Sequence, residues 1–247
     1  MKIGIVQIKP LKGDIEGNLD KHLLFLESVL EKKPDLLMFP ELSLTGYEPE
    51  LARNLAIHPD DSRLAPLQKI SDEHHVILCV GSPTVNNNDL FISMIIFQPN
   101  KERITYSKQY LYPTEKDIFT AGNTPCILSY DEENRIAPAI CYELSNNEHA
   151  DYARKMNATA YMASVLNSVN GVAADMERLS HVAATNQMTT FMANYIGESG
   201  GYECAGKSSI WNSKGELIAQ LDDTTEGILL YDSKTETVDS ITFINKS

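Results

Sequence analysis

Three residues with reactive side chains stand directly after runs that are typical of buried strands. Glu41 follows LLMFP, Lys108 follows RITYS, and Cys141 follows RIAPAI. Active residues of layered α/β proteins tend to lie where strands end, so these side chains could meet in one cavity. A thiol can attack an acyl carbon, a carboxylate can take the thiol proton, and an ammonium stabilises an oxyanion. The trio therefore predicts covalent catalysis on an amide through Cys141.

The chemistry assigns a different role to each member of this trio. Glu41 is the expected base, and the charge of Lys108 is expected to lower the pKa of the Cys141 thiol, so that it reacts with iodoacetamide before Cys79 or Cys126. Each residue also has a structural explanation when taken alone. A strand-end cysteine is often a small core residue, and the two charged side chains could be solvated.

A second motif suggests nucleotide binding. The stretch GYECAGKSS, which begins at Gly201, matches the phosphate-binding pattern G-x-x-x-x-G-K-[ST]. That site works only when a helix starts at the Lys-Ser pair, because the helix N-terminus helps to hold the phosphate. Lys207 and Ser208 lead instead into SSIW-NSKG-ELIAQL, which reads as two strands joined by a turn. We therefore expect no nucleotide site here.

The hydrophobic pattern predicts strands that alternate with helices. A helix is expected from Asn18, which can cap it, to the residues before Pro34, and further helices are expected over 62–75, from about 148, and over 172–186. The expected strands are KIGIVQI, DLLMF, VILCVGS, FISMIIF, RITYS, CILSY, RIAPAI, TAYMAS, FMANYI, SSIW, ELIAQL and GILLYD. Several of them pair as hairpins. This alternation indicates a layered α/β fold with helices packed on sheet faces.

Composition limits the classes of partner. The 247 residues are 43% hydrophobic and contain no linker or repeat, so we expect one domain over residues 1–247. The formal net charge of -13 argues against nucleic acid and anionic lipid, which select basic surfaces. No apolar stretch approaches membrane-spanning length. We expect a cytoplasmic protein that acts on a small molecule.

Cysteine and histidine spacing gives no sign of a metal site. The four cysteines show no C-x-x-C pair, and the six histidines lack the i, i+4 spacing of zinc-binding helices. We therefore expect neither a metal nor another cofactor.

Longer stretches around the three reactive residues resemble a known family. FPELSLTGY, SKQYLYPTEKDIFTAGN and APAICYEL are similar, in this order, to the three signature blocks of the nitrilase superfamily of carbon-nitrogen hydrolases. The similarity extends to KIGIVQI, AATNQMTTFMANYIG and AGKSSIWNSKGEL, and so covers nearly the whole chain.

The resemblance implies a four-layer αββα sandwich and a Glu-Lys-Cys triad of Glu41, Lys108 and Cys141. It implies cofactor-independent hydrolysis through a thioester, with Glu115 as a second glutamate that orients the substrate or the lysine. The backbone N–H of Tyr142 would join Lys108 in an oxyanion hole. Family members also pair through a helix-covered face, so a homodimer or larger homo-oligomer is implied, with 172–188 as the candidate surface.

The resemblance to the family also implies a structural role for the stretch that begins at Gly201. Gly206 and Ser208 fall on the family's G-x-S element, which shapes a turn before a core strand.

One loop departs from the family pattern. Many members continue with an aromatic-Pro-Glu turn after the cysteine block, whereas this chain has LSNNE at 144–148. We expect this loop and residues 47–50 to form pocket walls. The pocket candidates are Tyr47, Tyr112, Glu143, Glu148 and His149. His149 is also the one nearby histidine for a papain-like Cys-His pair, which its place in an expected helix disfavours.

Several functions stay open on the sequence. The first is a thiol amidohydrolase that releases ammonia from a small linear amide, a carbamoyl compound or, less readily, a nitrile. The alternatives on the same fold are an acyl transferase and a glutaminase-like ammonia donor. A catalytically silent scaffold is a further possibility.

Overall fold

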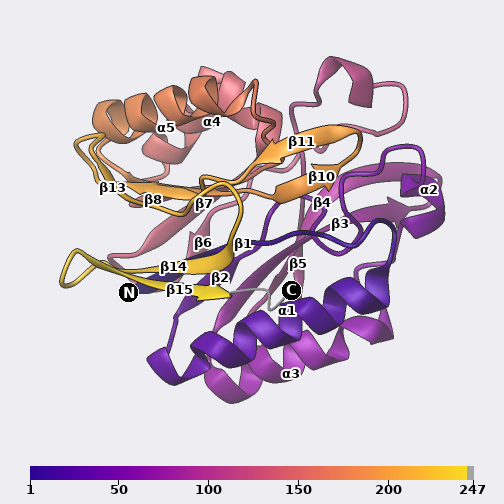
Figure 1. Cartoon of the computed structure of the whole chain (residues 1–247), viewed down its shortest axis with the longest axis horizontal. Helices are drawn as coiled ribbons and strands as arrows, with labels where there is room; N and C mark the ends of the chain where they lie inside the picture. The colour runs from indigo at the N-terminus through magenta and orange to yellow at the C-terminus, as the bar shows by residue number, and fades with distance from the viewer. Residues whose placement is uncertain (244–247) are drawn as a thin grey trace.

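Two large β-sheets lie in the middle of the molecule, and helices cover their outer faces (Figure 1). The structure is a computed structural model that describes residues 1–243. The layers follow the order helix, sheet, sheet, helix, so the expected four-layer αββα sandwich is confirmed. The expected domain runs to residue 247, and its last four residues lie outside the described part.

The first sheet has seven strands in the order β15-β14-β1-β2-β3-β4-β5. Its strands are β1 (Lys2–Gln7), β2 (Leu36–Met38), β3 (Ile77–Asn86), β4 (Asp89–Phe97), β5 (Ile104–Ser107), β14 (Glu226–Asp232) and β15 (Thr237–Phe243). The strands β1, β2 and β3 run parallel, and the other neighbours are antiparallel. Parallel strands are covered on both faces, which explains why β1 and β2 read as continuous apolar runs.

The second sheet has six strands in the order β13-β12-β9-β8-β7-β6. Its strands are β6 (Leu128–Ser129), β7 (Arg135–Ile140), β8 (Ala160–Ser164), β9 (Thr189–Ala193), β12 (Ser209–Trp211) and β13 (Leu217–Gln220). The central strands β7, β8 and β9 are parallel. A separate hairpin joins β10 (Ile196–Ser199) to β11 (Tyr202–Ala205).

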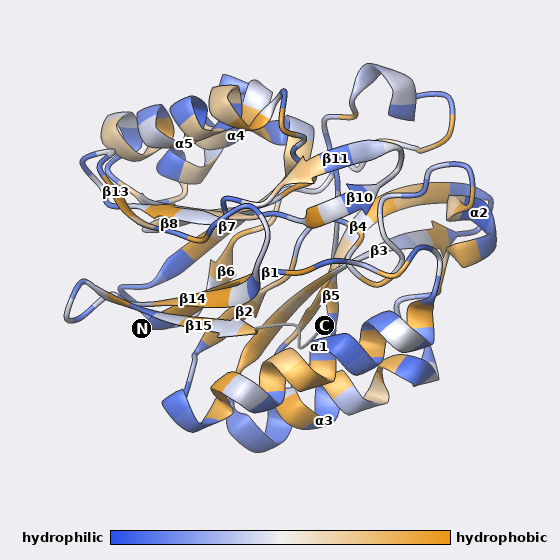
Figure 2. Ribbon diagram, in the orientation of Figure 1, coloured by the Kyte–Doolittle hydropathy of each residue, from blue (hydrophilic) through white to orange (hydrophobic). Residues whose placement is uncertain are grey.

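The helices lie in two groups. In Figure 1, α1 (Ile15–Val29) and α3 (Ala65–His74) cover the seven-stranded sheet, while α4 (Asn147–Lys155) and α5 (Val172–Asn186) cover the six-stranded sheet. The short helices are α2 (Ala52–Leu55), η1 (Leu30–Lys32), η2 (Ser62–Leu64), η3 (Pro113–Glu115) and η4 (Cys141–Ser145). Figure 2 shows apolar residues on the strands of the two inner layers and hydrophilic residues on the outer faces of the helices. The hydrophobic core therefore lies between the two sheets and between each sheet and the helices that cover it.

The expected cap of the first helix is wrong. Asp14 is the N-cap, and its carboxylate accepts from the N–H of Gly17 at 3.0 Å. Asn18 lies inside the helix with its side chain buried, where it bonds both main-chain groups of Leu11 and the carbonyl of Leu44. Both residue types cap helices well, and the pattern of leucines that begins at Leu19 pointed to the later one.

The Gly201–Ser208 stretch forms no phosphate-binding loop. It runs through β11 into β12, and Lys207 donates its N–H to the carbonyl of Asp222 instead of starting a helix. Gly206 has φ +60°, and a Cβ there would lie 2.7 Å from the carbonyl oxygen of Asp222. Ser208 Oγ accepts from the N–H of Asn194 at 2.9 Å. The glycine and serine thus shape a turn before β12, as the family pattern implied.

Several elements were missed by the sequence pattern. These are β15, the β10–β11 hairpin and the short helix α2. Over residues 1–243, no helix is both long and apolar enough to cross a bilayer.

Candidate active site

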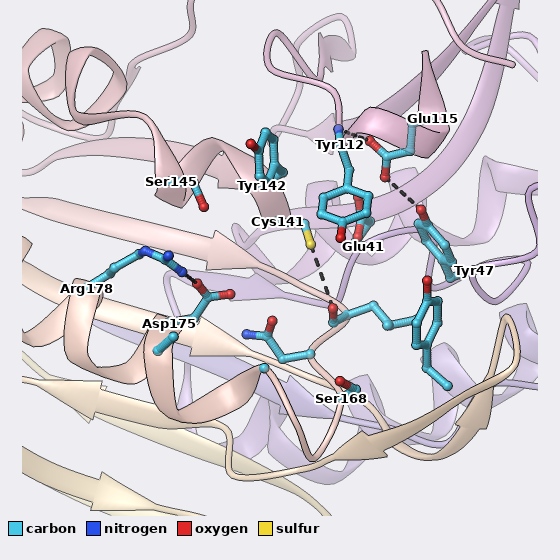
Figure 3. Close-up of a pocket in the computed structure, with 15 residues that line it drawn as sticks. Glu41, Tyr47, Tyr112, Glu115, Cys141, Tyr142, Ser145, Ser168, Asp175 and Arg178 are labelled. Carbon is cyan, nitrogen blue, oxygen red and sulfur yellow. Dashed lines mark hydrogen bonds and ion pairs between the residues drawn. The ribbon is translucent and has the colours of Figure 1, made fainter. Parts of the chain in front are cut away.

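The three reactive residues come together from the ends of strands in both sheets. Glu41 follows β2 and Lys108 follows β5 in the seven-stranded sheet, whereas Cys141 follows β7 in the six-stranded sheet. Glu41 and Cys141 line one pocket (Figure 3), and Lys108 lies buried behind that lining against Glu41. The convergence on which the sequence argument depended is therefore present.

Lys108 is fully buried between two carboxylates. Its Nζ lies 2.7 Å from Glu41 Oε1 and 2.9 Å from Glu115 Oε1. An ammonium has three N–H donors, so one remains for another acceptor. Burial by itself lowers the pKa of Lys108, but the charges of the surrounding acidic groups outweigh it and raise the pKa overall. Lys108 therefore stays an ammonium.

The backbone on either side of Glu41 is held by both sheets. The hydroxyl of Tyr195 donates to the Glu41 carbonyl, and Ser164 Oγ donates to the Phe39 carbonyl at 2.9 Å. Gly81 on β3 lets this turn lie close, because a Cβ there would be 2.2 Å from the backbone nitrogen of Leu42. These contacts of the backbone fix the position of the turn that carries the Glu41 carboxylate.

Glu41 has one oxygen free for chemistry. Its Oε1 accepts from Lys108, whereas its buried Oε2 has no hydrogen-bond partner among residues 1–243. Burial raises the pKa of Glu41 to about 7, although the positive charge of Lys108 opposes the shift. A carboxylate of this kind can accept and return a proton near neutral pH. Strongly shifted carboxylates in a pocket are typical of functional sites.

Cys141 sits on a strained turn that presents its sulfur to the pocket. It has φ +46° and is the first residue of η4, directly after β7. Positive φ is costly for a residue with a Cβ and persists where the surrounding structure enforces it. Its Sγ lies 3.7 Å from the carbonyl oxygen of Leu166 (Figure 3). This sharp turn resembles the elbows that expose nucleophiles in other hydrolases.

The expected lowering of the Cys141 pKa is wrong. Burial raises the pKa of the thiol well above its ordinary value, and the negative charge of Glu41 adds to the shift, while Lys108 opposes it. The positive charge of Lys108 also faces Glu41 and Glu115, so its effect on the thiol is outweighed. We therefore expect the thiol to lose its proton as it reacts.

Glu115 orients both Lys108 and Tyr47. Besides accepting from Lys108, Glu115 Oε1 accepts from the hydroxyl of Tyr47 at 2.8 Å. Its Oε2 accepts from the N–H of Tyr112 at 2.7 Å, which closes the short helix η3 on itself. A carboxylate that accepts three hydrogen bonds is held rigidly.

The pocket contains most of the predicted residues and several others. It has a volume of about 310 Å³, and its walls include the predicted Tyr47, Tyr112, Glu115 and Tyr142. Ser145 also lines it and belongs to the loop at 144–148 that was expected to form a wall. Lining residues that the sequence did not indicate are Leu166, Asn167, Ser168, Gly171, Ala174, Asp175, Arg178 and Tyr202. Residues 166–168 follow the end of β8, so the rule that active residues follow strand ends could have found them. The α5 residues carry no comparable signal.

Three pocket candidates lie elsewhere. Glu143 is fully buried outside the pocket walls, and Glu148 and His149 line a different cavity on the far side of η4. His149 bonds the hydroxyls of Tyr106 and Tyr161 through its two ring nitrogens. The expectation that they contact substrate is corrected accordingly, and a papain-like pair with His149 is excluded.

The part of the chain from residue 1 to 243 holds no group of three histidine, cysteine, aspartate or glutamate side chains arranged to bind a metal ion.

Comparison with known proteins identifies relatives across nearly the whole chain. A family model described as carbon-nitrogen hydrolase matches residues 2–243. A probable nitrilase of Schizosaccharomyces pombe is 25% identical over 238 residues, which cover 93% of this chain and 87% of that protein. A hydrolase in the agr operon of Staphylococcus aureus is 25% identical over 242 residues, covering 92% and 88% respectively.

A solved structure has the same fold. The NitN amidase of Nesterenkonia sp. AN1 superimposes with a TM-score of 0.84 at 24% identity, over 94% of this chain and 92% of that one. This structural likeness shows the fold, and the family model shows the relationship in sequence. The chain belongs to the carbon-nitrogen hydrolase family, the nitrilase superfamily.

Proposed function

We propose that this carbon-nitrogen hydrolase is a thiol amidohydrolase that cleaves a small linear amide through a thioester on Cys141 and releases ammonia. One observation carries the proposal. The free oxygen of Glu41 and the sulfur of Cys141 belong to the same pocket, with the Lys108 ammonium behind them. These are a base, a nucleophile and an electrostatic stabiliser in one place.

The first half of the reaction forms the thioester. Cys141 Sγ attacks the amide carbon while its proton passes to Glu41 Oε2, and the carbonyl oxygen becomes an oxyanion. The remaining N–H of Lys108 and the backbone N–H of Tyr142 stabilise that oxyanion. Glu41 then gives its proton to the departing nitrogen, the C–N bond breaks, and ammonia leaves.

The second half of the reaction returns the enzyme to its starting state. Glu41 takes a proton from a water molecule as the oxygen attacks the thioester carbon. The tetrahedral intermediate collapses, the C–S bond breaks, and the sulfur recovers the proton from Glu41. The products are a carboxylic acid and the free thiol, so the atoms and charges balance.

The pocket favours short, uncharged amides over anionic ones. Its charged lining residues are Glu41, Glu115, Asp175 and Arg178. Arg178 is already paired with Asp175, so no cation is left over for a substrate carboxylate. The volume of about 310 Å³ is at the lower end of the range for small-molecule pockets. A variant of the Nesterenkonia amidase has been solved with butyramide, which belongs to this class.

The test is an ammonia-release assay over short aliphatic amides, ω-amides with a free carboxylate, ureido acids and nitriles. We expect turnover of neutral amides such as butyramide, with the Cys141→Ala protein as the blank. A folded Cys141→Ala protein that keeps the wild-type rate would contradict the proposal. Identifying the acyl product, as free acid or as a new amide when an amine is added, separates hydrolysis from acyl transfer.

A further inference from the structure

Glu143 is a buried carboxylate that the proposed reaction does not use. It lies two residues after Cys141 in η4 and is fully enclosed. Each of its oxygens accepts a hydrogen bond from the main chain: Oε1 from the N–H of Gln109 at 2.6 Å, and Oε2 from the N–H of Ile140 at 2.7 Å. The carboxylate therefore joins two segments that are distant in the sequence.

The two segments are those that carry the reactive residues. Gln109 directly follows Lys108, and Ile140 directly precedes Cys141. Lys108 is attached to β5 of the seven-stranded sheet, whereas Cys141 is attached to β7 of the six-stranded sheet. One carboxylate thus ties together the strand ends that supply the ammonium and the thiol from opposite sheets.

A chain of aromatic side chains holds the carboxylate in place. The hydroxyl of Tyr106 lies 2.8 Å from both oxygens of Glu143 and 2.9 Å from Nε2 of His149. His149 Nδ1 lies 2.8 Å from the hydroxyl of Tyr161. Burial raises the pKa of Glu143 to about 7. In its ionised form Glu143 can only accept, so Tyr106 then donates to Glu143, His149 Nε2–H donates to Tyr106, and Tyr161 donates to His149.

This network also connects the two sheets. Tyr106 belongs to β5, Tyr161 belongs to β8, and His149 lies on α4 between them in the hydrogen-bond chain. Every member is buried. A buried polar network whose members are all satisfied is rigid, because breaking any one bond leaves an unpaired polar group. The carboxylate of Glu143, which ties the two segments together, is thus itself held by the chain of hydrogen bonds through Tyr106, His149 and Tyr161.

We propose that Glu143 is a positioning residue that sets the distance between the Cys141 sulfur and the Glu41–Lys108 pair. The inference rests on the proposed function. Glu41 and Lys108 come from one sheet and Cys141 from the other, so their spacing depends on how the sheets are tied at this edge. A displacement of about 1 Å between reacting groups can lower a rate about 100-fold.

The first test is Glu143→Gln. The carboxamide keeps one acceptor oxygen but turns an NH2 group toward the other backbone N–H, so one tie is lost. We expect kcat to fall about 10- to 100-fold with KM nearly unchanged, because the residue does not line the substrate pocket. Tyr106→Phe keeps both main-chain bonds and removes the hydroxyl, so its kcat should fall less. Glu148→Gln, an exposed change on α4, is the control and should match wild type.

A second measurement requires no amide substrate. The rate of Cys141 alkylation by iodoacetamide reports whether Glu41 can take the thiol proton. We expect Glu143→Gln to slow alkylation in parallel with kcat, while Glu148→Gln leaves it unchanged. If wild type hydrolyses no amide, the proposed function fails, but the alkylation rates still test whether Glu143 positions the thiol against Glu41.

The proposal is overturned by a Glu143→Gln protein that melts at a lower temperature yet keeps wild-type kcat and alkylation rate. That result would make the carboxylate purely structural. If Glu143→Gln does not fold, Glu143→Asp decides the question, because its shorter side chain cannot reach both backbone N–H groups. A folded Glu143→Asp protein with unchanged kcat and unchanged alkylation would overturn the proposal equally.

Discussion

At the scale of single residues, the site is organised around proton transfer from sulfur to carboxylate. The raised pKa of Cys141 and the pKa of about 7 for Glu41 place the resting proton on the thiol and leave the carboxylate able to take it. Lys108 supplies a fixed positive charge that does not titrate near neutral pH. We therefore expect the ionisation of the base, and not a preformed thiolate, to control the rate.

The dependence of activity on pH follows from this arrangement. Glu41 must be ionised to accept the thiol proton, so kcat/KM should rise with pH through about 7 and then level off. The same rise should appear in the rate of Cys141 alkylation. In Glu41→Gln, alkylation should be slower, and its rise near pH 7 should be absent. A limb near pH 7 that persists in that variant would assign it to another group.

The same carboxyl should also affect stability. Its folded-state pKa is raised above the ordinary value of 4.5, so the stability it contributes is present below pH 4.5 and is lost as the pH rises through about 7. Glu41→Gln keeps an oxygen for Lys108 and removes the buried negative charge. We therefore expect the free energy of unfolding of Glu41→Gln to rise relative to that of wild type between pH 5 and pH 8. Denaturant melts at the two pH values measure this, and a difference between the two proteins that does not change with pH would contradict it.

At the scale of elements, the strand ends determine where the reactive residues lie. The turn that carries Glu41 packs directly on β3 at Gly81. Gly81→Ala forces a methyl group against the backbone of Leu42, so the turn must move and carry the carboxylate with it. We expect a loss of about 1–3 kcal/mol in stability and a larger proportional loss in activity. Thermal melts and ammonia release measure the two effects.

Gly171→Ala is the matched control for stability. Its Cβ would meet no atom closer than 3.7 Å, and the residue does not have a positive φ. Gly171 is the N-cap of α5, where alanine is less favourable than glycine, so we expect a small fall in melting temperature that is clearly less than that of Gly81→Ala. Equal melting temperatures for the Gly81 and Gly171 variants would show that the turn tolerates the methyl group.

The sequence predicted the reactive trio because strand ends are readable from local patterns. β2, β5 and β7 each show a clear run of strand-forming residues; Lys108 and Cys141 follow directly, and Glu41 follows within three residues. The direction in which a side chain points after a strand is not readable in the same way. A 3₁₀ helix has three residues per turn, so Glu143 leaves η4 on a different side from Cys141. This explains why Glu143 was expected in the pocket and lies behind it.

Long-range contacts account for the other differences. Asn18 and Asp14 are both good capping residues, and only the buried contacts of Asn18 with Leu11 and Leu44 distinguish them. Asp175 and Arg178 reach the pocket because α5 packs beside it, which no local pattern records. Residues that act through tertiary packing were thus the ones that the sequence could not place.

At the scale of the whole molecule, the fold brings two sheets together so that each supplies part of the site. Both sheets also hold the Glu41 turn: Gly81 on β3 packs against it, and Ser164 on β8 and Tyr195 after β9 donate hydrogen bonds to its carbonyls. Glu143 adds a further connection between the sheets, because it accepts from the N–H groups of Gln109 after β5 and Ile140 at the end of β7. The activity is therefore expected to depend on the packing of the sheets against each other as well as on the three reactive side chains.

The oligomeric state stays a prediction at this scale. The family resemblance implies pairing through a helix-covered face, and α5 on the six-stranded sheet is our candidate. Light scattering at micromolar concentration should give at least twice the mass of 27.5 kDa. A single species at the monomer mass would contradict the prediction.

The central claim is that Cys141 becomes acylated by the amide. Mass spectrometry of protein quenched during butyramide turnover tests it most directly. We predict a mass increase equal to the acyl group less one hydrogen, located on the peptide that contains Cys141 and absent from the Cys141→Ala protein. Turnover with no adduct on that peptide, together with ammonia release by Cys141→Ala, would contradict the account.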